Sequence, residues 1–191
     1  MVEAVRSELI LGGQRSGKSR RAEALARSWL AASPQRRAVM IATGQPWDDE
    51  MRERIERHRQ DRALTLPGMT TVEEPLALAN ALRQHSDTGT LMVVDCLTLW
   101  LTNLLMPVEP SKALTDAAVL EAGAALCQAI EQAAGPVVLV SNEVGLGVIP
   151  MGREVRAYVD ALGRLNQQVA SVCERVTLMA AGLPLPLKGI A

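Results

Sequence analysis

A chain of 191 residues can bury one substantial hydrophobic core. Its formal net charge of −1 provides no overall electrostatic attraction to nucleic acid or to a membrane surface. Aromatic residues make up only 2% of the chain, too few for the stacking platforms that bind single-stranded nucleic acid. The start has no apolar leader and no apolar run approaches the length of a membrane span, so we expect a cytoplasmic protein without membrane insertion. Cys96, Cys127 and Cys173 lack metal-ligand spacing and are expected to be reduced thiols.

The first chemical signal follows the first predicted strand, residues 7–11 (SELIL). The next eight residues, GGQRSGKS, satisfy the pattern G-x-x-x-x-G-K-[ST], and a helical pattern continues through about Ala32. Glycines let backbone N–H groups turn towards phosphate oxygens, and the helix presents its positive N-terminal end. Lys18 is expected to reach the β- and γ-phosphates, and the Ser19 hydroxyl to hold Mg²⁺; the alternative is a corner that merely needs glycine. The predicted loop comprises Gly12, Gly13, Gln14, Arg15, Ser16, Gly17, Lys18 and Ser19.

A second signal is the charged stretch DDEMRERIERHRQDR, in which eleven of fifteen residues are charged. On an ideal helix Met51, Ile55, His58 and Arg62 lie within about 60° of one another, so His58 shares the face of the only apolar residues, which should point at the protein body. A neutral imidazole can attack phosphorus, and neighbouring arginines would lower its pKa and balance charge on a phosphorylated intermediate. From these residues alone, His58 is either a nucleophile or a packing or surface histidine.

The apolar run TLMVVD, residues 90–95, is typical of a strand covered on both faces. Its last residue, Asp95, is the best candidate for the acid that orients the water shell of a metal beside a phosphate-binding loop. The alternative is a helix N-cap for the segment that starts near Leu97, and both roles are compatible. Cys96 stands where motor-type ATPases commonly place a water-activating Glu, and there is no N-K-x-D segment to read guanine. Both absences favour a transferase that acts on a small molecule.

The remaining elements alternate between strands and helices along the chain. Further strands are predicted at 38–42, 70–73, 136–141 and 176–181, and helices at 48–62, 75–85, 97–105, 115–134 and 153–173. Such an order predicts right-handed βαβ units, a mostly parallel sheet with helices on both faces, and ligands beyond the carboxyl ends of the strands. We therefore predict an α/β fold of the P-loop NTPase (RecA-like) type, with residues 1–191 forming a single nucleotide-binding catalytic domain.

Two further segments carry polar residues with open roles. The segment SNEVGLGVIP follows a buried strand, so Asn142 and Glu143 should lie near the strand tips. They either bind metal, the substrate hydroxyl or the nucleotide, or belong to a glycine-shaped turn with a helix cap. In the last helix, Gly163 is expected to allow close packing, and Arg164 and Asn166 to face substrate or another subunit.

Nearly end to end, the chain resembles the bifunctional adenosylcobinamide kinase / adenosylcobinamide-phosphate guanylyltransferases of cobalamin biosynthesis. The resemblance is carried by GGQRSGKS, IATGQPWDDEMRERIERHRQDR, TVEEP, VVDCLTLWLTNLL, SNEVGLGVIP, GRLNQ and GLPLPLKG. The phosphate-binding loop alone is generic. Its combination with RI-x-x-H, SNEVG and TNLL is highly specific.

The resemblance implies two reactions. In the first, ATP or GTP phosphorylates the hydroxyl of the aminopropanol arm of adenosylcobinamide. In the second, a histidine attacks the α-phosphorus of GTP, releases pyrophosphate and passes GMP to adenosylcobinamide phosphate, which gives adenosylcobinamide-GDP. Through RI-x-x-H the guanylylated histidine falls on His58, and Lys18 is the second catalytic residue. The nucleotide positions implied beyond the loop are Ala42, Thr43, Gly44, Arg59, Gln60, Asp61, Arg62, Glu73 and Asp95, with Ser19 and Asp95 as Mg²⁺ ligands.

The resemblance also implies a homo-oligomer, a trimer in this family, and no nucleic-acid partner. Two alternatives stay open on the residues. One is a monofunctional P-loop kinase for another small alcohol, with a structural His58. The other is a nucleotide-dependent switch or motor that binds a macromolecule, for which the residue after Asp95, the scarce aromatics and the balanced charge are all unfavourable.

Overall fold

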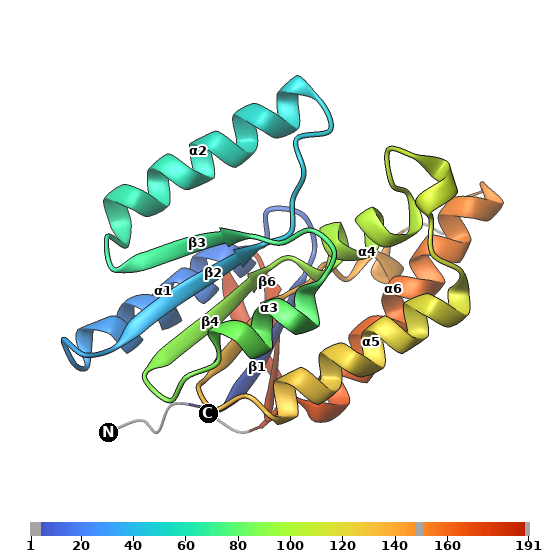
Figure 1. Cartoon of the computed structure of the whole chain (residues 1–191). Coiled ribbons are helices and arrows are strands. Elements are labelled where there is room, and N and C mark those ends of the chain that lie inside the picture. The colour runs from blue at the N-terminus through green and yellow to red at the C-terminus, as the bar shows by residue number, and fades with distance from the viewer. Residues whose placement is uncertain (1–4, 148–150, 190–191) are drawn as a thin grey trace.

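A computed structural model of the chain describes residues 5–147 and 151–189, without the side chains of residues 54, 58 and 61–63. Its centre is a seven-stranded sheet in the order β3-β2-β4-β5-β1-β6-β7 (Figure 1). The described strand pairs are parallel except for β6 with β7, which is antiparallel. The strands are β1 (Ser7–Gly12), β2 (Arg37–Ala42), β3 (Met69–Glu73), β4 (Thr90–Asp95), β5 (Val137–Val140), β6 (Arg175–Ala180) and β7 (Leu183–Lys188).

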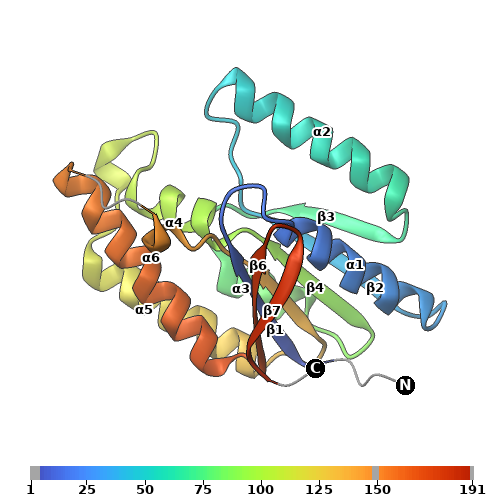
Figure 2. The same ribbon diagram turned by 180° about the vertical axis from the view of Figure 1, so that it is seen from behind.

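Helices cover both faces of the sheet. The helices are α1 (Lys18–Ala31), α2 (Asp49–Thr65), α3 (Leu78–His85), α4 (Leu97–Leu105), α5 (Asp116–Glu131) and α6 (Arg153–Val172), with 3₁₀ turns η1 (Pro110–Lys112) and η2 (Val144–Leu146). The helices α3 to α6 pack on one face and α1 on the other, while α2 stands over the β2–β3 edge (Figure 1, Figure 2). Among the described residues, no helix is both long and apolar enough to cross a membrane.

Two hydrophobic clusters hold these layers together. On the α3–α6 face, Trp100 is buried and its indole Nε1 donates to the Leu76 carbonyl oxygen at 2.8 Å. On the α1 face, Trp29 donates to the Arg37 carbonyl oxygen at 3.0 Å. Both rings therefore bury large apolar areas without leaving an N–H group unpaired. The central strands β4 and β5 are buried along almost their whole length, which fixes the positions of their carboxyl ends.

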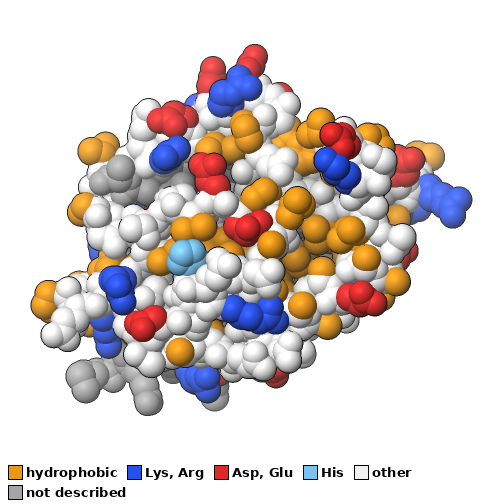
Figure 3. Space-filling view, viewed as in Figure 1, with side chains coloured by type: hydrophobic (Ala, Val, Ile, Leu, Met, Phe, Trp, Pro, Cys, Tyr) orange, Lys and Arg blue, Asp and Glu red, His pale blue; other side chains and the backbone are white. Residues whose placement is uncertain are grey.

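Charged side chains of both signs are interspersed on the surface. On the face shown in Figure 3, Lys and Arg side chains lie among Asp and Glu side chains, over α2 at the top of the view as well as elsewhere. This mixture agrees with the formal net charge of −1. The absence of a nucleic-acid partner stays a prediction.

The strand β7 is an element that the sequence did not predict. Pro184 and Pro186 interrupt its pattern, and proline is tolerated in strands mainly at a sheet edge, where β7 lies. The turn before it has two residues with positive φ, Ala181 at 51° and Gly182 at 81°, as the two-residue turns of tight hairpins require. The Gly182 N–H group donates to the Ser16 carbonyl oxygen at 3.0 Å, so this hairpin braces the loop after β1.

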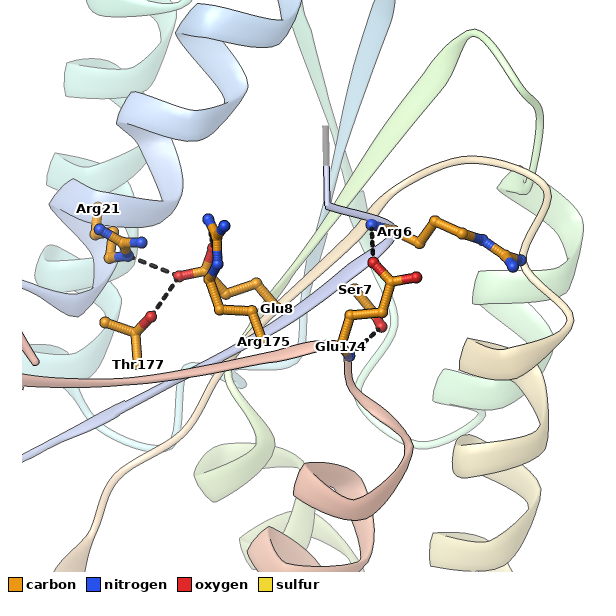
Figure 4. Close-up of polar contacts among 7 residues, drawn as sticks. All are labelled: Arg6, Ser7, Glu8, Arg21, Glu174, Arg175 and Thr177. Atoms are coloured by element: carbon orange, nitrogen blue, oxygen red, sulfur yellow. Dashed lines mark hydrogen bonds and ion pairs between the residues drawn. The ribbon is translucent and has the colours of Figure 1, made fainter. Parts of the chain in front are cut away.

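A buried carboxylate ties α1 to the sheet beneath that loop (Figure 4). Glu8 on β1 is 2% exposed, and its Oε1 accepts from Arg21 Nε at 2.7 Å and from Thr177 Oγ1 at 2.8 Å. The Arg175 guanidinium lies 3.7 Å from the other carboxylate oxygen, Oε2. Three elements, β1, α1 and β6, thus meet at one charge with two cationic neighbours.

Replacing this carboxylate is expected to destabilise the fold. In Glu8→Ala, two guanidinium groups lose their partner in a partly buried setting, so the free energy of unfolding should fall by about 3–5 kcal/mol. Urea unfolding followed by circular dichroism measures the change. The matched control is Glu174→Ala, which should cost under about 1 kcal/mol, because among the described residues its exposed carboxylate accepts from the Arg6 N–H group alone. Equal losses in the two variants would contradict a special role of the buried charge.

Candidate active site at the carboxyl ends of the strands

The loop between β1 and α1 is wound tightly. Gly12 and Gly17 have φ angles of 154° and 102°, and a Cβ on Gly12 would lie 2.6 Å from the Met179 carbonyl oxygen. The Lys18 Nζ donates to the Gly13 carbonyl oxygen at 2.7 Å, so this side chain folds back across the loop. Gly12 and Gly17 are therefore required by backbone conformation, as the phosphate-binding motif predicts.

The loop and α2 line one hollow of about 620 Å³, which we call the phosphate hollow. Arg15, Lys18 and Arg20 line it from the loop and the start of α1, and Arg57 lines it from α2. Glu50 and Glu53 of α2 and Asp95 at the end of β4 are the carboxylates around it, and Ser19 also lines it. The Ser16 Oγ is buried and has no hydrogen-bond partner among the described residues. Among the described side chains, four cations beside a helix N-terminus suit a polyphosphate.

A second hollow of about 190 Å³, the side chamber, adjoins the first at the tips of β2 and β4. Met51 and Ile55 are half-buried and line it, which confirms that this face of α2 points at the protein body. Arg59 and Glu73 also line it, with Arg59 NH1 3.7 Å from Glu73 Oε1. Asp95 and Ser19 line both hollows. A ligand with a polar head in the phosphate hollow can therefore extend into the side chamber.

Ser19 and Asp95 provide a hydroxyl and a carboxylate oxygen at the junction of the two hollows. These are the hard donors that Mg²⁺ accepts together with phosphate oxygens and water, so the residues present fit the predicted ion. Asp95 does not cap α4, because Cys96 is the N-cap residue and no side chain makes a capping hydrogen bond there. The alternative role weighed for Asp95 is thus not seen.

The segment after β5 is held by long-range hydrogen bonds. The Asn142 N–H group donates to Thr98 Oγ1 at 2.9 Å, and its carbonyl oxygen accepts from Asn166 Nδ2 at 3.1 Å. Asn166 also accepts from Ser141 Oγ at 2.7 Å. The Glu143 N–H group donates to the Gly12 carbonyl oxygen at 3.2 Å. This segment is therefore fixed to both α6 and the phosphate-binding loop. Residues 148–150 of SNEVGLGVIP lie outside the described residues.

At the level of the whole chain, a sequence profile described as "Cobinamide kinase / cobinamide phosphate guanyltransferase" matches residues 8–187. The chain belongs to this family. Among curated proteins it is similar to the "Bifunctional adenosylcobalamin biosynthesis protein CobP" of Pseudomonas aeruginosa, with 49% identity over 95% of this chain and 97% of that protein. It is also similar to the "Bifunctional adenosylcobalamin biosynthesis protein CobU" of Escherichia coli, with 36% identity over 94% of this chain and 98% of that protein. The resemblance seen in the motifs is confirmed.

Solved structures of more distant sequence share the fold. A protein from Pyrococcus horikoshii OT3 matches with a TM-score of 0.54 and 12% identity, over 97% of this chain and 87% of that chain. The flagellar accessory protein FlaH of Methanocaldococcus jannaschii matches with a TM-score of 0.54 and 11% identity, over 97% and 79%. At these identities the likeness concerns the fold alone, and together with the mostly parallel sheet it confirms the predicted α/β fold.

Most nucleotide positions implied for this cobinamide kinase family lie around the two hollows. Ala42, Gly44, Arg59, Glu73 and Asp95 line the side chamber, and residues 14–19 line the phosphate hollow. Gly13 lies in the loop itself, where its carbonyl oxygen holds Lys18.

Two other implied positions, Thr43 and Gln60, do not line either hollow. Thr43 is fully buried, and its Oγ1 donates to the Cys96 carbonyl oxygen at 2.7 Å, so it joins the ends of β2 and β4. Gln60 Nε2 donates to Glu56 Oε1 at 2.8 Å on an exposed part of α2. The side chains of His58, Asp61 and Arg62 lie outside those described, and the structure places only their backbone, within α2. The roles assigned to all of these residues stay predictions.

Two expectations about α6 are wrong. A Cβ on Gly163 would meet nothing within 4 Å, so this glycine is not required for close packing within the chain. Asn166 is 4% exposed and hydrogen-bonded within the protein, so it faces neither substrate nor another subunit. Arg164 is exposed. The sequence carried no sign of the Asn166 contacts, because they join residues more than twenty positions apart.

Cys96 lines both hollows of this protein, yet its thiol is expected to be unreactive. Burial, and to a smaller extent the Asp95 carboxylate, raises its pKa to about 11, so the nucleophilic thiolate is scarce at pH 8. Iodoacetamide at pH 8 should modify Cys96 about 100-fold more slowly than it modifies free glutathione, as measured by peptide mass spectrometry. Because the pKa of Cys96 is raised in the folded state, the unfolded chain loses its thiol proton at lower pH. The fold therefore loses stability as the pH rises from the usual thiol pKa to about 11. Alkylation of Cys96 at the glutathione rate would contradict its burial.

Proposed function

We propose that this protein catalyses both reactions named for its family. A nucleoside triphosphate, ATP or GTP, phosphorylates the hydroxyl on the aminopropanol arm of adenosylcobinamide, and GMP is then transferred from GTP to give adenosylcobinamide-GDP. The observation that carries the proposal is that α2, the helix of His58, lines the same hollow as the phosphate-binding loop. One triphosphate in that hollow is thus within reach of elements suited to chemistry at either end of its phosphate chain.

In the kinase step, the chain's own residues position and neutralise the triphosphate. Backbone N–H groups of residues 12–19 and the N-terminus of α1 surround the phosphates, and Lys18 turns from the Gly13 carbonyl oxygen to the β- and γ-phosphates. Ser19 and Asp95 would hold Mg²⁺, which when bound would offset the charge that develops on the phosphate oxygens. The acceptor oxygen bonds to the γ-phosphorus, and the nucleoside diphosphate leaves with the electron pair.

In the guanylyltransferase step, His58 attacks the α-phosphorus of GTP and pyrophosphate leaves. The GMP–histidine intermediate is then attacked by a phosphate oxygen of adenosylcobinamide phosphate, and the imidazole departs neutral. Covalent catalysis splits a transfer between two bulky anions into two easier displacements. Arg57 and Arg59, which line the two hollows, offset the charge of the bound phosphates. The guanine base and ribose occupy the side chamber beside Glu73.

The proposal extends to assembly and location. A homotrimer is proposed from the family resemblance, and sedimentation equilibrium measures it directly. A trimer mass supports the assembly, and a monomer at all concentrations contradicts it. A cytoplasmic location stays a prediction from the sequence.

The test of the function follows adenosylcobinamide in the presence of Mg²⁺ and GTP. Mass spectrometry should detect first a product heavier by one phosphoryl group, and then the GDP derivative together with released pyrophosphate. A reaction that stops at the phosphorylated product would favour the monofunctional kinase and contradict the second step. No phosphorylation of adenosylcobinamide by either ATP or GTP would contradict the first step.

A further inference from the structure

Behind the phosphate-binding loop lies a groove of about 730 Å³ that belongs to neither hollow. We call it the back groove. Residues 13–16 form one wall, residues 142–144, 146 and 147 a second, and residues 178–181 at the end of β6 a third. In the sheet order the side chamber lies at the tips of β2 and β4, whereas the back groove lies at the tips of β5, β1 and β6. The two openings therefore flank the loop on opposite sides.

Asn142 and Gln14 each line the phosphate hollow, the side chamber and the back groove, so the three spaces meet at these two residues. Asn142 is the one whose backbone is fixed from α4 and α6. Its backbone is held at both N–H and C=O by Thr98 and Asn166. Glu143 follows it and lines the back groove. Within the described part of the chain, neither the Asn142 amide nor the Glu143 carboxylate has a hydrogen-bond or ion-pair partner. A rigid backbone thus presents two unused polar groups, Asn142 at the edge of the phosphate hollow and Glu143 in the adjoining back groove.

The side chains that line the back groove suit a mostly uncharged ligand better than a second nucleotide. Its described charges are one guanidinium, Arg15, and one carboxylate, Glu143. A second nucleotide, which brings several negative charges, would find little compensation there. The rest of the lining is largely apolar and open, with Val144 38% exposed and Leu146 77% exposed. These features suit a large, mostly uncharged molecule that places a single polar arm against Asn142 and Glu143.

The geometry of phosphoryl transfer points the same way. The attacking oxygen and the leaving oxygen must lie roughly in line through phosphorus. Five of the nucleotide positions implied by the family line the side chamber, namely Ala42, Gly44, Arg59, Glu73 and Asp95. An acceptor that approaches from the back groove therefore arrives from the other side of the loop. Asn142 stands at the boundary that such an acceptor must reach.

We infer that the back groove binds the alcohol acceptor of the kinase step and that Glu143 is the general base for its hydroxyl, an inference that rests on the kinase reaction proposed above. The hydroxyl proton passes to the Glu143 carboxylate as the oxygen bonds to the γ-phosphorus, and the bond to the β-phosphate oxygen breaks with its electron pair on the diphosphate. The carboxylic acid then releases its proton to solvent. The Asn142 amide orients the hydroxyl and the γ-phosphate by hydrogen bonds.

The decisive variant is Glu143→Gln, which keeps the size of the side chain and removes the base. The kcat for phosphorylation of adenosylcobinamide should fall by about 10²–10³-fold, while the KM for the nucleotide stays within about twofold. Labelling of the protein by GTP carrying ³²P at the α-phosphate should be unchanged, because that step uses no alcohol acceptor. Leu146→Asp should raise the KM for adenosylcobinamide by about tenfold with little change in kcat.

Control variants separate failure of the Glu143 assignment from failure of the proposed kinase function. Glu121→Gln, at an exposed position on α5, should keep both activities. Glu53→Gln removes a carboxylate that lines the phosphate hollow from α2, and a larger loss of kinase kcat there than in Glu143→Gln would overturn the assignment of the base. Loss of both activities in Glu143→Gln would mean that the residue only supports the loop, and full kinase activity would exclude it as the base. Wild-type protein that phosphorylates no adenosylcobinamide would instead refute the proposed kinase function.

Discussion

The His58→Ala protein is expected to take up no label from GTP carrying ³²P at its α-phosphate, a loss of at least about 10⁴-fold relative to wild type. Transfer of the γ-phosphate to adenosylcobinamide should continue within about threefold, because that reaction uses the phosphate-binding loop and not the imidazole. The denatured wild-type chain should carry label that is labile in acid and stable in alkali, as a phosphorus–nitrogen bond on histidine requires. Filter binding of the denatured protein measures the label.

The matched control is His85→Ala, which removes the only other histidine from the last residue of α3. It should keep full labelling and full kinase activity. Label that survives in His58→Ala would assign the nucleophile to another residue. A wild-type protein that stays unlabelled while it transfers γ-phosphate would make His58 structural and restore the monofunctional kinase.

The placement of Met51 and Ile55 on α2 supports the expected role of His58. Met51 and Ile55, which the sequence placed on the same helical face as His58, are half-buried and line the side chamber. A Cβ on Gly44 would lie 3.7 Å from Ile55 Cδ1, so the helix face comes close to the turn after β2. The four-residue spacing of Met51 and Ile55 was sufficient here, because residues i and i+4 lie on the same face of a helix.

The strands were predictable for a similar reason. Short apolar runs predicted β1, β2, β4, β5 and β6 within one residue at each end, because largely buried strands leave a nearly continuous apolar signal. The edge strand β3, which has no buried residue, was also placed within one residue although it lacks this signal. The strand β7 carries no such signal. Its residues are exposed, two of them are proline, and its pairing with β6 depends on the turn at Ala181 and Gly182. An edge strand of this kind cannot be predicted from its own residues, because its formation depends on pairing with the neighbouring strand.

Buried polar contacts around the site escaped prediction altogether. Asn103, in the TNLL motif, donates to the Thr43 carbonyl oxygen at 2.7 Å and to the Pro75 carbonyl oxygen at 3.0 Å. These bonds join α4 to the turns that follow β2 and β3, so Asn103 fixes one wall of the side chamber from behind. Such residues have no periodicity and no fixed spacing from their partners. The motif identified Asn103 as part of the family pattern, but only the structure shows what it contacts.

Replacement of Lys18 should have a broader effect than replacement of His58. In Lys18→Ala the triphosphate loses a buried cation beside the phosphate-binding loop, and charge developing on phosphate oxygens is less stabilised in both reactions. We expect kinase kcat and the rate of His58 guanylylation each to fall by about 10²–10³-fold. The same two assays measure them, with pyrophosphate release as an independent readout of the second.

Because Lys18 also donates to the Gly13 carbonyl oxygen, its loss must be separated from damage to the fold. Loss of this hydrogen bond from a charged donor should lower the free energy of unfolding by about 1.5–3 kcal/mol, which urea unfolding can check. Lys112→Ala, which removes a surface ion pair with Glu109, should leave both rates unchanged. If Lys18→Ala abolished γ-phosphate transfer but left guanylylation intact, the α-phosphorus chemistry would be using a second nucleotide site. If Lys18→Ala loses both activities to a similar extent, whereas His58→Ala loses guanylylation alone, a single triphosphate site serves both reactions.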